Sequence, residues 1–487
     1  MPIDDSLLRI AKGEILDDAW HRLVYSVDAS HYQITPEAVV CPVDASDVQE
    51  VCRYSSAKQI PVAARGAGTG LLGQSLSDGI MLDLTKHMNR IIEVGSDYVI
   101  AQPGVVKAVL DKELRSHGKF LPPDPASSNY CTLGGMIANN SSGIHCLGYG
   151  NTIDFVDGVS LVYADGTEGY ADGDEHDKRL EKLRSLLLPD MNIIQNGFPK
   201  VSKNSCGYRL DSLFHHNSYL PHKLFAASEG TLGIVVKAKL RIIDLPEHRC
   251  MLVLGFKDLV GAVSAVPAIL RFLPVALEMM DHTVVSGARE TRDSGCLLFV
   301  EFAGTKALAE RRFTECRDMM EKICLVLEYA SDETSLSRIW GARKGALNNI
   351  MKLTVGSRKP VGLIEDTVVL PRLLEEHVIA LLQEYRQNKM EYVMYGHVGD
   401  GNVHTRPLID LESPAQLKLM NSVADNVFRR VAESGGSITG EHGDGIARSP
   451  YIALLYGQPI MDLFQRVKEL LDPRYLLNPG KKVPAAK

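Results

Sequence analysis

The sequence predicts an α+β protein with two domains and a short C-terminal tail. A chain of 487 residues is too long for one compact core. Up to Pro246, short apolar strands alternate with glycine-rich loops and a few helices, whereas helical patterns alternate with strands beyond it. We therefore expect a first domain over residues 1–245, a second over residues 246–470, and a tail over residues 471–487 that returns to the first domain.

The first domain begins with a βαβ-like pattern. Short apolar runs predict its strands at residues 39–43, 60–64, 80–84, 91–94, 99–102, 156–163 and 233–243, and longer periodic runs predict helices at residues 46–58 and 105–117. In the second domain, one helical face is formed by Leu417, Met420, Ala424, Val427 and Val431 and ends at Gly435-Gly436. Another amphipathic pattern runs over residues 460–471 and stops before Pro473.

The composition excludes several classes of protein. A net charge of −7 does not supply the phosphate-neutralising surface of a nucleic-acid binder. No apolar run approaches the roughly 20 residues that span a bilayer, and the acidic N-terminus lacks signal-peptide features. The nine cysteines are scattered and contain no Cys-x-x-Cys pair, which argues against a disulfide framework or a metal cluster held by this chain alone. We expect a cytoplasmic protein, with peripheral attachment to a membrane still open.

Two short segments concentrate metal-ligating residue types, residues 395–404 and 440–445. Asp400-Gly401 is typical of a two-residue hairpin turn, which would place His397 opposite His404 with Cβ atoms about 5 Å apart. Two imidazoles at that distance can share one cation. Glu441 could complete the site, leaving His442 to move protons.

Glycine-rich loops mark a candidate anion site in the first domain. Residues 65–70 follow a predicted strand, and adjacent N–H groups in such a loop can bind a pyrophosphate that approaches the backbone closely. The loop does not open a long helix, so it is not the fingerprint of a Rossmann unit. Residues 132–140 are similarly rich in small side chains, although a plain buried turn would explain them as well.

These motifs together resemble a known family. The runs 25–30, 61–74, 122–150 and 229–234 resemble the flavin domain of the vanillyl-alcohol oxidase superfamily, while 397–404 and 440–443 resemble its branch of FAD-linked D-2-hydroxyacid dehydrogenases. That branch includes D-lactate dehydrogenases, D-2-hydroxyglutarate dehydrogenases and the glycolate oxidase catalytic subunit. The resemblance covers nearly the whole chain, in the expected order. It implies a two-subdomain FAD-binding domain of the vanillyl-alcohol oxidase (PCMH) type followed by an α+β substrate (cap) domain.

The resemblance also implies which residues contact FAD. They are Arg65, Gly66, Ala67, Gly68, Thr69, Gly70, Gln74, Pro123, Asp124, Ser127, Thr132, Gly134, Gly135, Asn139, Ser142, Gly143, Gly230, Thr231, Gly233, Ile234, Val235 and Asn478. Members with covalent flavin often carry a histidine in or just after the first glycine loop. This chain has Thr69 and Gly70 there, so we expect non-covalent FAD.

For the second domain, the resemblance assigns divalent-metal ligation to His397, His404 and Glu441 and the catalytic base to His442. Such a ligand set suits zinc, iron or manganese and leaves positions open for a chelating hydroxyacid. Imidazole titrates near neutrality, so His442 can take the hydroxyl proton while a hydride leaves C2 for flavin N5. Asn402 is a candidate contact to the substrate.

The choice of substrate depends on which cationic side chains can bind the carboxylates of the substrate. Arg343 matches the arginine of the family's Trp-x-x-Arg segment and is the candidate carboxylate clamp. Dehydrogenases for 2-hydroxyglutarate carry a lysine in a Lys-Tyr-Asp segment where this chain reads Ile364-Glu365-Asp366, so a second carboxylate would need another cation, with Lys344, Arg358 and Lys359 as candidates. We therefore expect D-lactate as substrate, followed by glycolate or D-2-hydroxyglutarate.

The segment of residues 364–367 resembles the dehydrogenase arm of proteins that carry a C-terminal iron–sulfur domain. This chain ends about where that domain would begin, so we expect a separate electron acceptor, either an iron–sulfur subunit or an electron-transfer flavoprotein. Two alternatives stay open: a non-redox flavin-dependent transferase of the same fold and a flavin-binding regulatory subunit. The intact histidines and Glu441 argue against the second.

Overall fold

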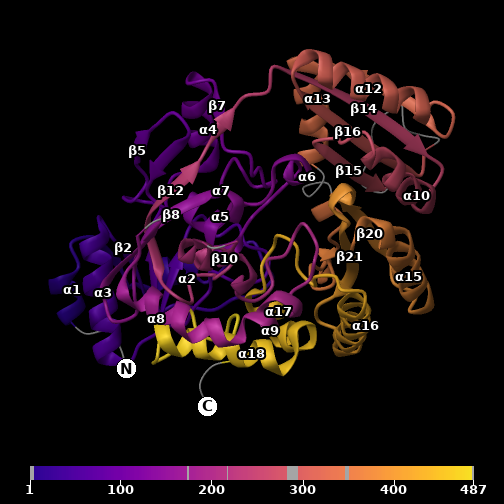
Figure 1. Cartoon of the computed structure of the whole chain (residues 1–487). Helices are drawn as coiled ribbons and strands as arrows, with labels where there is room; N and C mark the ends of the chain where they lie inside the picture. Colours follow the sequence, from indigo (N-terminus) through magenta and orange to yellow (C-terminus); the bar gives the residue numbers. More distant parts are fainter. Residues whose placement is uncertain (1–4, 173–174, 217, 282–293, 346–349, 485–487) are drawn as a thin grey trace.

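The computed structural model describes residues 5–172, 175–216, 218–281, 294–345 and 350–484. Figure 1 shows the first half of the chain as one body and residues from about 250 to 430 as a second body beside it. The path crosses once at β14 (His248–Phe256) and returns through the C-terminal segment, which lies against the first body. The division into domains at residues 245 and 470 stays a prediction.

A small sheet with parallel strands opens the first body. Its strand order is β1 (Glu14–Leu16), β2 (Ala38–Cys41), β4 (Ile80–Asp83), β3 (Val62–Arg65), and both β2 and β3 run parallel to β4. Helix α3 (Ala45–Lys58) connects β2 to β3, and Asp44 caps its N-terminus. The predicted βαβ start is confirmed. Strand β2 ends at Cys41, earlier than predicted, because Pro42 has no N–H to continue a ladder.

A second, antiparallel sheet completes the first body. Its order is β5 (Ile91–Val94), β6 (Tyr98–Ala101), β12 (Ile234–Arg241), β8 (Val156–Val162), β9 (Glu168–Asp172). The helices around it are α4 (Lys107–Ser116), α5 (Leu133–Asn139), α6 (Cys146–Tyr149), α7 (Thr152–Phe155), α8 (Lys178–Leu187) and α9 (Met191–Gly197). The predicted strands and the helix at 105–117 are found within a few residues.

The second body is built on one large sheet. Its order is β17 (Leu325–Ala330), β14, β16 (Cys296–Gly304), β15 (Ala276–Asp281), β20 (Tyr392–Gly396), β21 (Asn402–Asp410), β18 (Arg358–Pro360), with β19 (Thr367–Val368) also paired to β21. Its helices include α10 (Leu259–Leu270), α12 (Lys306–Met320), α13 (Glu333–Lys344), α15 (Leu374–Gln387) and α16 (Pro414–Glu433). Among the described helices, none is long and apolar enough to cross a membrane.

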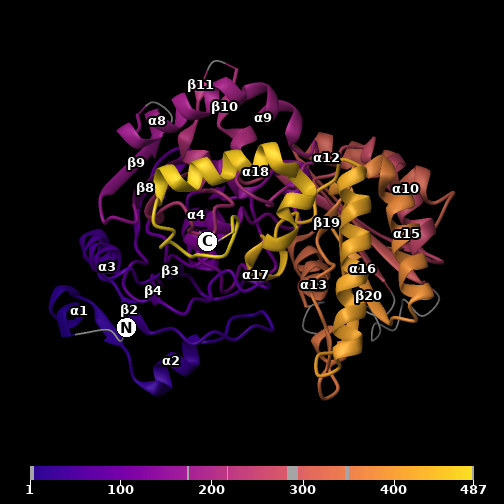
Figure 2. The same ribbon diagram turned by 90° about the horizontal axis from the view of Figure 1, so that it is seen from below.

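The C-terminal segment joins the two bodies. After α17 (Gly445–Arg448), helix α18 (Ile452–Leu471) lies along the first body, as Figure 2 shows from below. Leu477 then forms a parallel bridge with Val62 of β3. The ammonium group of Lys482 is fully buried, and its Nζ lies 2.7 Å from Asp444 and 3.2 Å from Glu229. Residues from the far end of the chain thus complete the core of the first body.

Candidate active site

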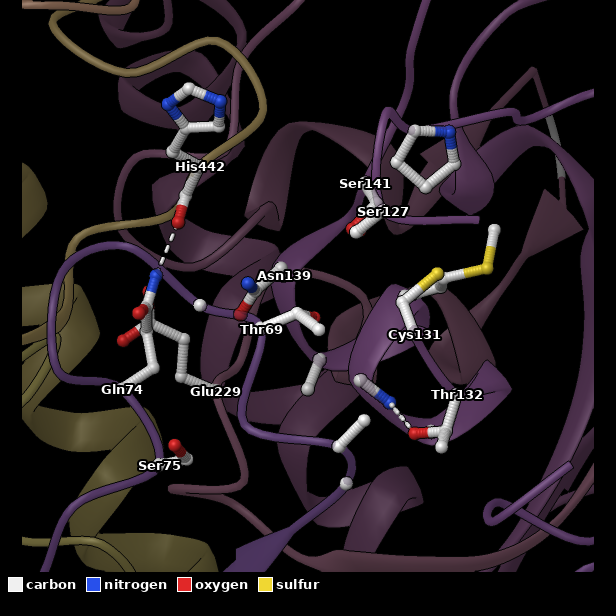
Figure 3. Close-up of a pocket in the computed structure, with 18 of the residues that line it drawn as sticks. Thr69, Gln74, Ser75, Ser127, Cys131, Thr132, Asn139, Ser141, Glu229 and His442 are labelled. Carbon is white, nitrogen blue, oxygen red and sulfur yellow. Dashed lines mark hydrogen bonds between the residues drawn. The ribbon is translucent and has the colours of Figure 1, made fainter. Parts of the chain in front are cut away.

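A cavity lies where the two bodies meet. Most of its wall comes from three segments of the first body, residues 64–75, 125–144 and 225–235. One end is closed by side chains from other elements, namely Arg343, Tyr395, His397, His404, Glu441 and His442. Figure 3 shows Thr69, Asn139 and Glu229 around this cavity with the loop of His442 at its edge. The glycine-rich segments and the histidines, far apart in sequence, therefore line one space.

The first glycine loop exposes its backbone because Gly66, Gly68 and Gly70 have no side chains. A Cβ on Gly66 would lie 2.3 Å from Thr132 Oγ1, so the two glycine-rich segments can touch only without one. Gly68 has a φ of +66°, a conformation that glycine adopts without strain. The resulting surface of main-chain groups suits a phosphate-bearing ligand.

Most of the predicted FAD contacts line this cavity. They are Arg65, Gly66, Ala67, Gly68, Thr69, Gly70, Gln74, Ser127, Thr132, Gly134, Gly135, Asn139, Ser142, Gly230, Gly233, Ile234 and Val235. The side chain of Gln74 donates to the carbonyl of His442 and so joins the first glycine loop to the histidine loop (Figure 3). Whether these residues contact FAD stays a prediction.

Five predicted contacts are placed off the cavity wall. Pro123 is buried beside Asp124, whose carboxylate accepts from His145 Nδ1 at 2.8 Å. A Cβ on Gly143 would lie 2.3 Å from the carbonyl oxygen of Asp124, so its role is close backbone packing. Thr231 Oγ1 donates to the Ser228 carbonyl, and Asn478 donates to the carbonyls of Gln74 and Glu229. These residues support the wall from behind.

Sequence reasoning missed Glu229. This buried carboxylate lines the cavity and accepts from the N–H groups of Asp444 at 2.6 Å and Gly445 at 3.0 Å. Lys482, more than 200 residues away in sequence, supplies its counter-charge. Glu229 is the first residue of the 229–234 run, but its contacts could not be predicted, because Asp444, Gly445 and Lys482 are distant along the chain.

The predicted hairpin register around Asp400-Gly401 is wrong. Tyr395, not His397, pairs with His404, because residues Val398–Asp400 form a turn of 3₁₀ helix between β20 and β21. Gly401 has a φ of +71°, and a Cβ there would lie 1.9 Å from the Val369 carbonyl oxygen. Packing against that distant segment therefore sets the turn. The rings of His397 and His404 nevertheless lie close together, with centroids 5.2 Å apart.

Three imidazoles converge on one carboxylate oxygen. Oε1 of Glu441 lies 2.9 Å from Nε2 of His397, 3.5 Å from Nε2 of His404 and 3.7 Å from Nε2 of His442. The other oxygen, Oε2, accepts from the Ser142 hydroxyl at 2.6 Å and from the buried ammonium of Lys203 at 3.1 Å. Glu441 is thus held by the first body while Oε1 faces the histidines.

The opposite nitrogens of the rings have different partners. Nδ1 of His397 lies 2.6 Å from Glu278, and Nδ1 of His442 lies 3.0 Å from Glu365. Nδ1 of His404 is buried without a hydrogen bond to any described residue. Burial lowers the pKa of His404 to about 4. Burial opposes the charge of His397 too, but Glu278 and Glu441 raise its pKa to about 9.

Asp366 lies close enough to join His404, Glu441 and His442 as a fourth ligand. Its carboxylate is already occupied, however. Oδ2 accepts from the N–H groups of Gly440 at 2.9 Å, Glu441 at 3.0 Å and His442 at 2.9 Å, and Oδ1 accepts from Asn402 at 3.1 Å. A carboxylate with this many donors is poorly suited to a cation, so Asp366 is better explained as the group that holds the 440–442 loop.

His404 and Glu441 belong to the described group of potential ligands, and the predicted set that adds His397 to them stays a prediction. Ligand atoms about 2.0–2.2 Å from a tetrahedral zinc ion are roughly 3–3.5 Å apart. The separations of 2.9 Å and 3.5 Å between the Glu441 oxygen and the two ring nitrogens fit that spacing. Glu278 behind His397 supplies the carboxylate that metal-bound histidines usually have.

Of the other predicted substrate contacts, one lines the cavity and the rest of the described ones do not. Arg343 lines the cavity, its Nη2 lies 2.6 Å from Glu278, and its guanidinium lies 5.3 Å from the centre of the Tyr395 ring. Asn402 is fully buried off the cavity wall and donates to Asp366 and the Thr367 carbonyl. Arg358 pairs with Glu391 at the surface, Lys359 is exposed, and the side chain of Lys344 lies outside the described part.

Comparison with known families defines the class of protein. Residues 36–168 match an FAD binding domain, and residues 245–482 match the C-terminal domain of FAD linked oxidases. The chain therefore belongs to the FAD-linked oxidase and dehydrogenase family of flavoenzymes. It is 29% identical to the glycolate oxidase subunit GlcD of Bacillus subtilis over 98% of this chain and 96% of that protein. It is 31% identical to a D-2-hydroxyglutarate dehydrogenase of Escherichia coli, over 95% of this chain and 50% of that protein.

The chain spans about half the length of the D-2-hydroxyglutarate dehydrogenases that it matches. Solved structures with the same fold include a 4-ethylphenol oxidase from Gulosibacter chungangensis, with a TM-score of 0.71 and 15% identity over 97% of this chain and 94% of that one. A p-cresol methylhydroxylase aligns with a TM-score of 0.68 and 16% identity over the same shares. The predicted vanillyl-alcohol oxidase (PCMH) type fold is confirmed.

Proposed function

We propose that this chain is a metal-assisted, FAD-dependent dehydrogenase of a D-2-hydroxyacid, with D-lactate first and glycolate or D-2-hydroxyglutarate next. The observation that carries the proposal is the convergence of three imidazole Nε2 atoms on Glu441 Oε1 at one end of a glycine-lined cavity. An oxidation of this kind needs a place for a dinucleotide and a polar site next to it. The glycine-rich segments and the imidazole cluster line the same cavity.

The wall of the cavity fits FAD. Its glycine-rich segments offer main-chain groups rather than charged side chains, as close approach of a pyrophosphate requires. Neither Thr69 nor Gly70 offers an imidazole for covalent attachment, which supports non-covalent binding. FAD bound in this cavity would accept the hydride from the carbon that carries the substrate hydroxyl.

The donor set fits a divalent cation on His397, His404 and Glu441. A cation held there, with zinc, iron and manganese all suited to the set, would act as a Lewis acid on the hydroxyl and carboxylate of a 2-hydroxyacid. His442 lines the cavity with Nε2 on the side of Glu441, and there it takes the hydroxyl proton. Arg343 orients the substrate carboxylate.

The cations at the cavity favour a small monocarboxylate. Among the described lining residues, Arg65 and Arg343 are the cationic lysine or arginine side chains. Arg65 donates to the Tyr25 and Val27 carbonyls, whereas Arg343 lies beside the histidines and donates to Glu278 through Nε and Nη2, so a substrate carboxylate would share its guanidinium. One guanidinium matches one carboxylate. D-lactate or glycolate satisfies this better than a dicarboxylate.

Electrons would pass to a separate acceptor, an iron–sulfur subunit or an electron-transfer flavoprotein. The name of the Bacillus relative, a glycolate oxidase subunit, supports a multi-subunit assembly. A cytoplasmic location, with membrane attachment only through such a partner, agrees with the nine free cysteines.

One anaerobic experiment tests the proposal. The purified flavoprotein is mixed separately with D-lactate, L-lactate, glycolate and D-2-hydroxyglutarate, and the oxidised-flavin band near about 450 nm is followed. We expect fast bleaching by D-lactate and none by L-lactate. Bleaching by none of the four would overturn the proposal and favour a non-redox transferase or a regulatory flavin subunit. Elemental analysis of the same sample is expected to find one divalent cation per chain.

A further inference from the structure

Glu365 stands out among the buried charges near the cavity because the proposed mechanism gives it no role. Its carboxylate is fully buried and does not line the cavity, so it cannot bind a substrate group. Oε1 lies 3.0 Å from Nδ1 of His442. Oε2 lies 3.0 Å from Nη2 of the buried Arg406, an ion pair without the alignment of a hydrogen bond.

The backbone explains why two successive carboxylates reach the same loop. In an extended strand, Glu365 and Asp366 would point to opposite faces. Asp366 instead has a φ of +68°, uncommon outside glycine, and this breaks the alternation. Asp366 then accepts from the main-chain N–H of His442 at 2.9 Å while Glu365 accepts from its ring. Arg448 fixes the turn by donating to the Glu365 carbonyl at 2.6 Å.

We propose that Glu365 is the positioning residue of the base: it holds His442 with its proton on Nδ1, so that Nε2 presents its lone pair toward the substrate site. This inference rests on the proposed function and deepens it. A neutral imidazole carries one proton, and an acceptor at Nδ1 decides which nitrogen keeps it. Arg406 stabilises the ionised carboxylate of Glu365 from the other side.

A second pair in the same site provides the matched control. Glu278 contacts Nδ1 of His397 at 2.6 Å just as Glu365 contacts Nδ1 of His442. His397 belongs to the proposed metal ligands, whereas His442 is the proposed base. The two carboxylates therefore make the same kind of contact behind residues of different roles, and their amide variants should fail in different ways.

The test compares Glu365→Gln with Glu278→Gln in the FAD-loaded protein. Glu365→Gln should keep wild-type FAD and metal content but reduce its flavin roughly 10²-fold more slowly in a single turnover, with KM changed less than about 3-fold. Glu278→Gln should instead lower the metal content, and because Glu278 also pairs with Arg343, it should raise KM as well. Because Glu365→Gln leaves the Arg406 charge unpaired, the double variant Glu365→Gln/Arg406→Met is prepared as well and should be equally slow.

Histidine-selective ¹⁵N NMR gives a readout that does not depend on turnover. The signal of His442, identified by its absence in His442→Gln, should report a proton on Nδ1 in the wild type and a changed tautomer in Glu365→Gln. A folded Glu365→Gln or double variant with wild-type cofactor content, unchanged tautomer and a rate within about 2-fold of wild type would overturn the inference. If no hydroxyacid reduces the wild type, the proposed function fails, and the NMR comparison alone decides the role of Glu365.

Discussion

The two ends of the cavity are lined by different chemical groups. At the first end, glycines and small side chains expose main-chain groups, and Gly66 packs directly against Thr132. At the second end, ionisable side chains meet, and three imidazoles face one carboxylate. Bare backbone recognises a ligand by shape, whereas the charged end can move protons and hold a cation. A change at the first end should therefore affect cofactor binding, and a change at the second should affect turnover.

The largest expected effect that separates the two ends comes from His404→Gln. Nδ1 of His404 has no hydrogen bond to a described residue, so this change removes a proposed ligand without leaving a charge unpaired. We expect metal content to fall and flavin reduction to slow by roughly 10³-fold, with FAD content unchanged. Elemental analysis and stopped-flow absorbance measure these quantities. Loss of FAD together with turnover would contradict the separation of roles.

Lys482→Met tests the support behind the first end. The change leaves Glu229 and Asp444 buried without their cation, so the free energy of unfolding should fall by about 3–5 kcal/mol. Urea denaturation of the FAD-loaded protein measures the loss. The double variant Lys482→Met/Asp444→Asn should recover part of it, and a double variant as unstable as the sum of the singles would argue against direct coupling.

His145 connects the two bodies, and its contribution should depend on pH. The ring lies 2.8 Å from Asp124 and 3.3 Å from Glu301, and although burial opposes the charge, these carboxylates raise the pKa of His145 to about 10. Because the pKa of His145 is higher in the folded state, its ion pairs stabilise the fold fully below the unfolded pKa near 6.5. This stabilisation is lost as the pH rises toward 10. The unfolding free energies of wild type and His145→Gln should therefore differ most at about pH 6, by a few kcal/mol, and converge toward pH 10. A difference that stays constant over this range would count against the ion pair.

Gly66→Ala should act at the first end alone. The added Cβ would lie 2.3 Å from Thr132 Oγ1 and force the two loops apart. We expect FAD affinity to fall roughly 10-fold, from a repacking cost of about 1–3 kcal/mol, with metal content unchanged. Gly341→Ala is the matched control, because a Cβ there meets nothing within 4 Å and α13 tolerates alanine. Equal effects of the two variants on FAD affinity would show that the contact between Gly66 and Thr132 does not determine FAD binding.

The smallest expected effect is that of Arg358→Ala. Its ion pair with Glu391 joins two exposed side chains at the surface. Stability should change by no more than about 1 kcal/mol, and the KM for a hydroxyacid should not change. A raised KM for D-2-hydroxyglutarate alone would assign this arginine to a distal carboxylate.

The sequence allowed more of the architecture to be predicted than of the contacts. The βαβ start and helix α16 follow from local periodicity, and the proximity of His397 and His404 followed from their spacing around one turn. The register of that turn could not be predicted, because the Val369 carbonyl packs against Gly401. Asn402 contacts Asp366 rather than the cavity for a similar reason, because strand β19 pairs with β21 and places Val368 opposite Asn402.

The bridge between Val62 and Leu477 has a consequence for biosynthesis. A ribosome releases residue 62 long before residue 477, so the edge of β3 emerges without the segment that later pairs with it. The first body cannot reach its final packing until the second has been made, and contacts this distant in sequence slow folding. Until then, the edge of β3 and the pocket for the Lys482 side chain are exposed to solvent and to chaperones.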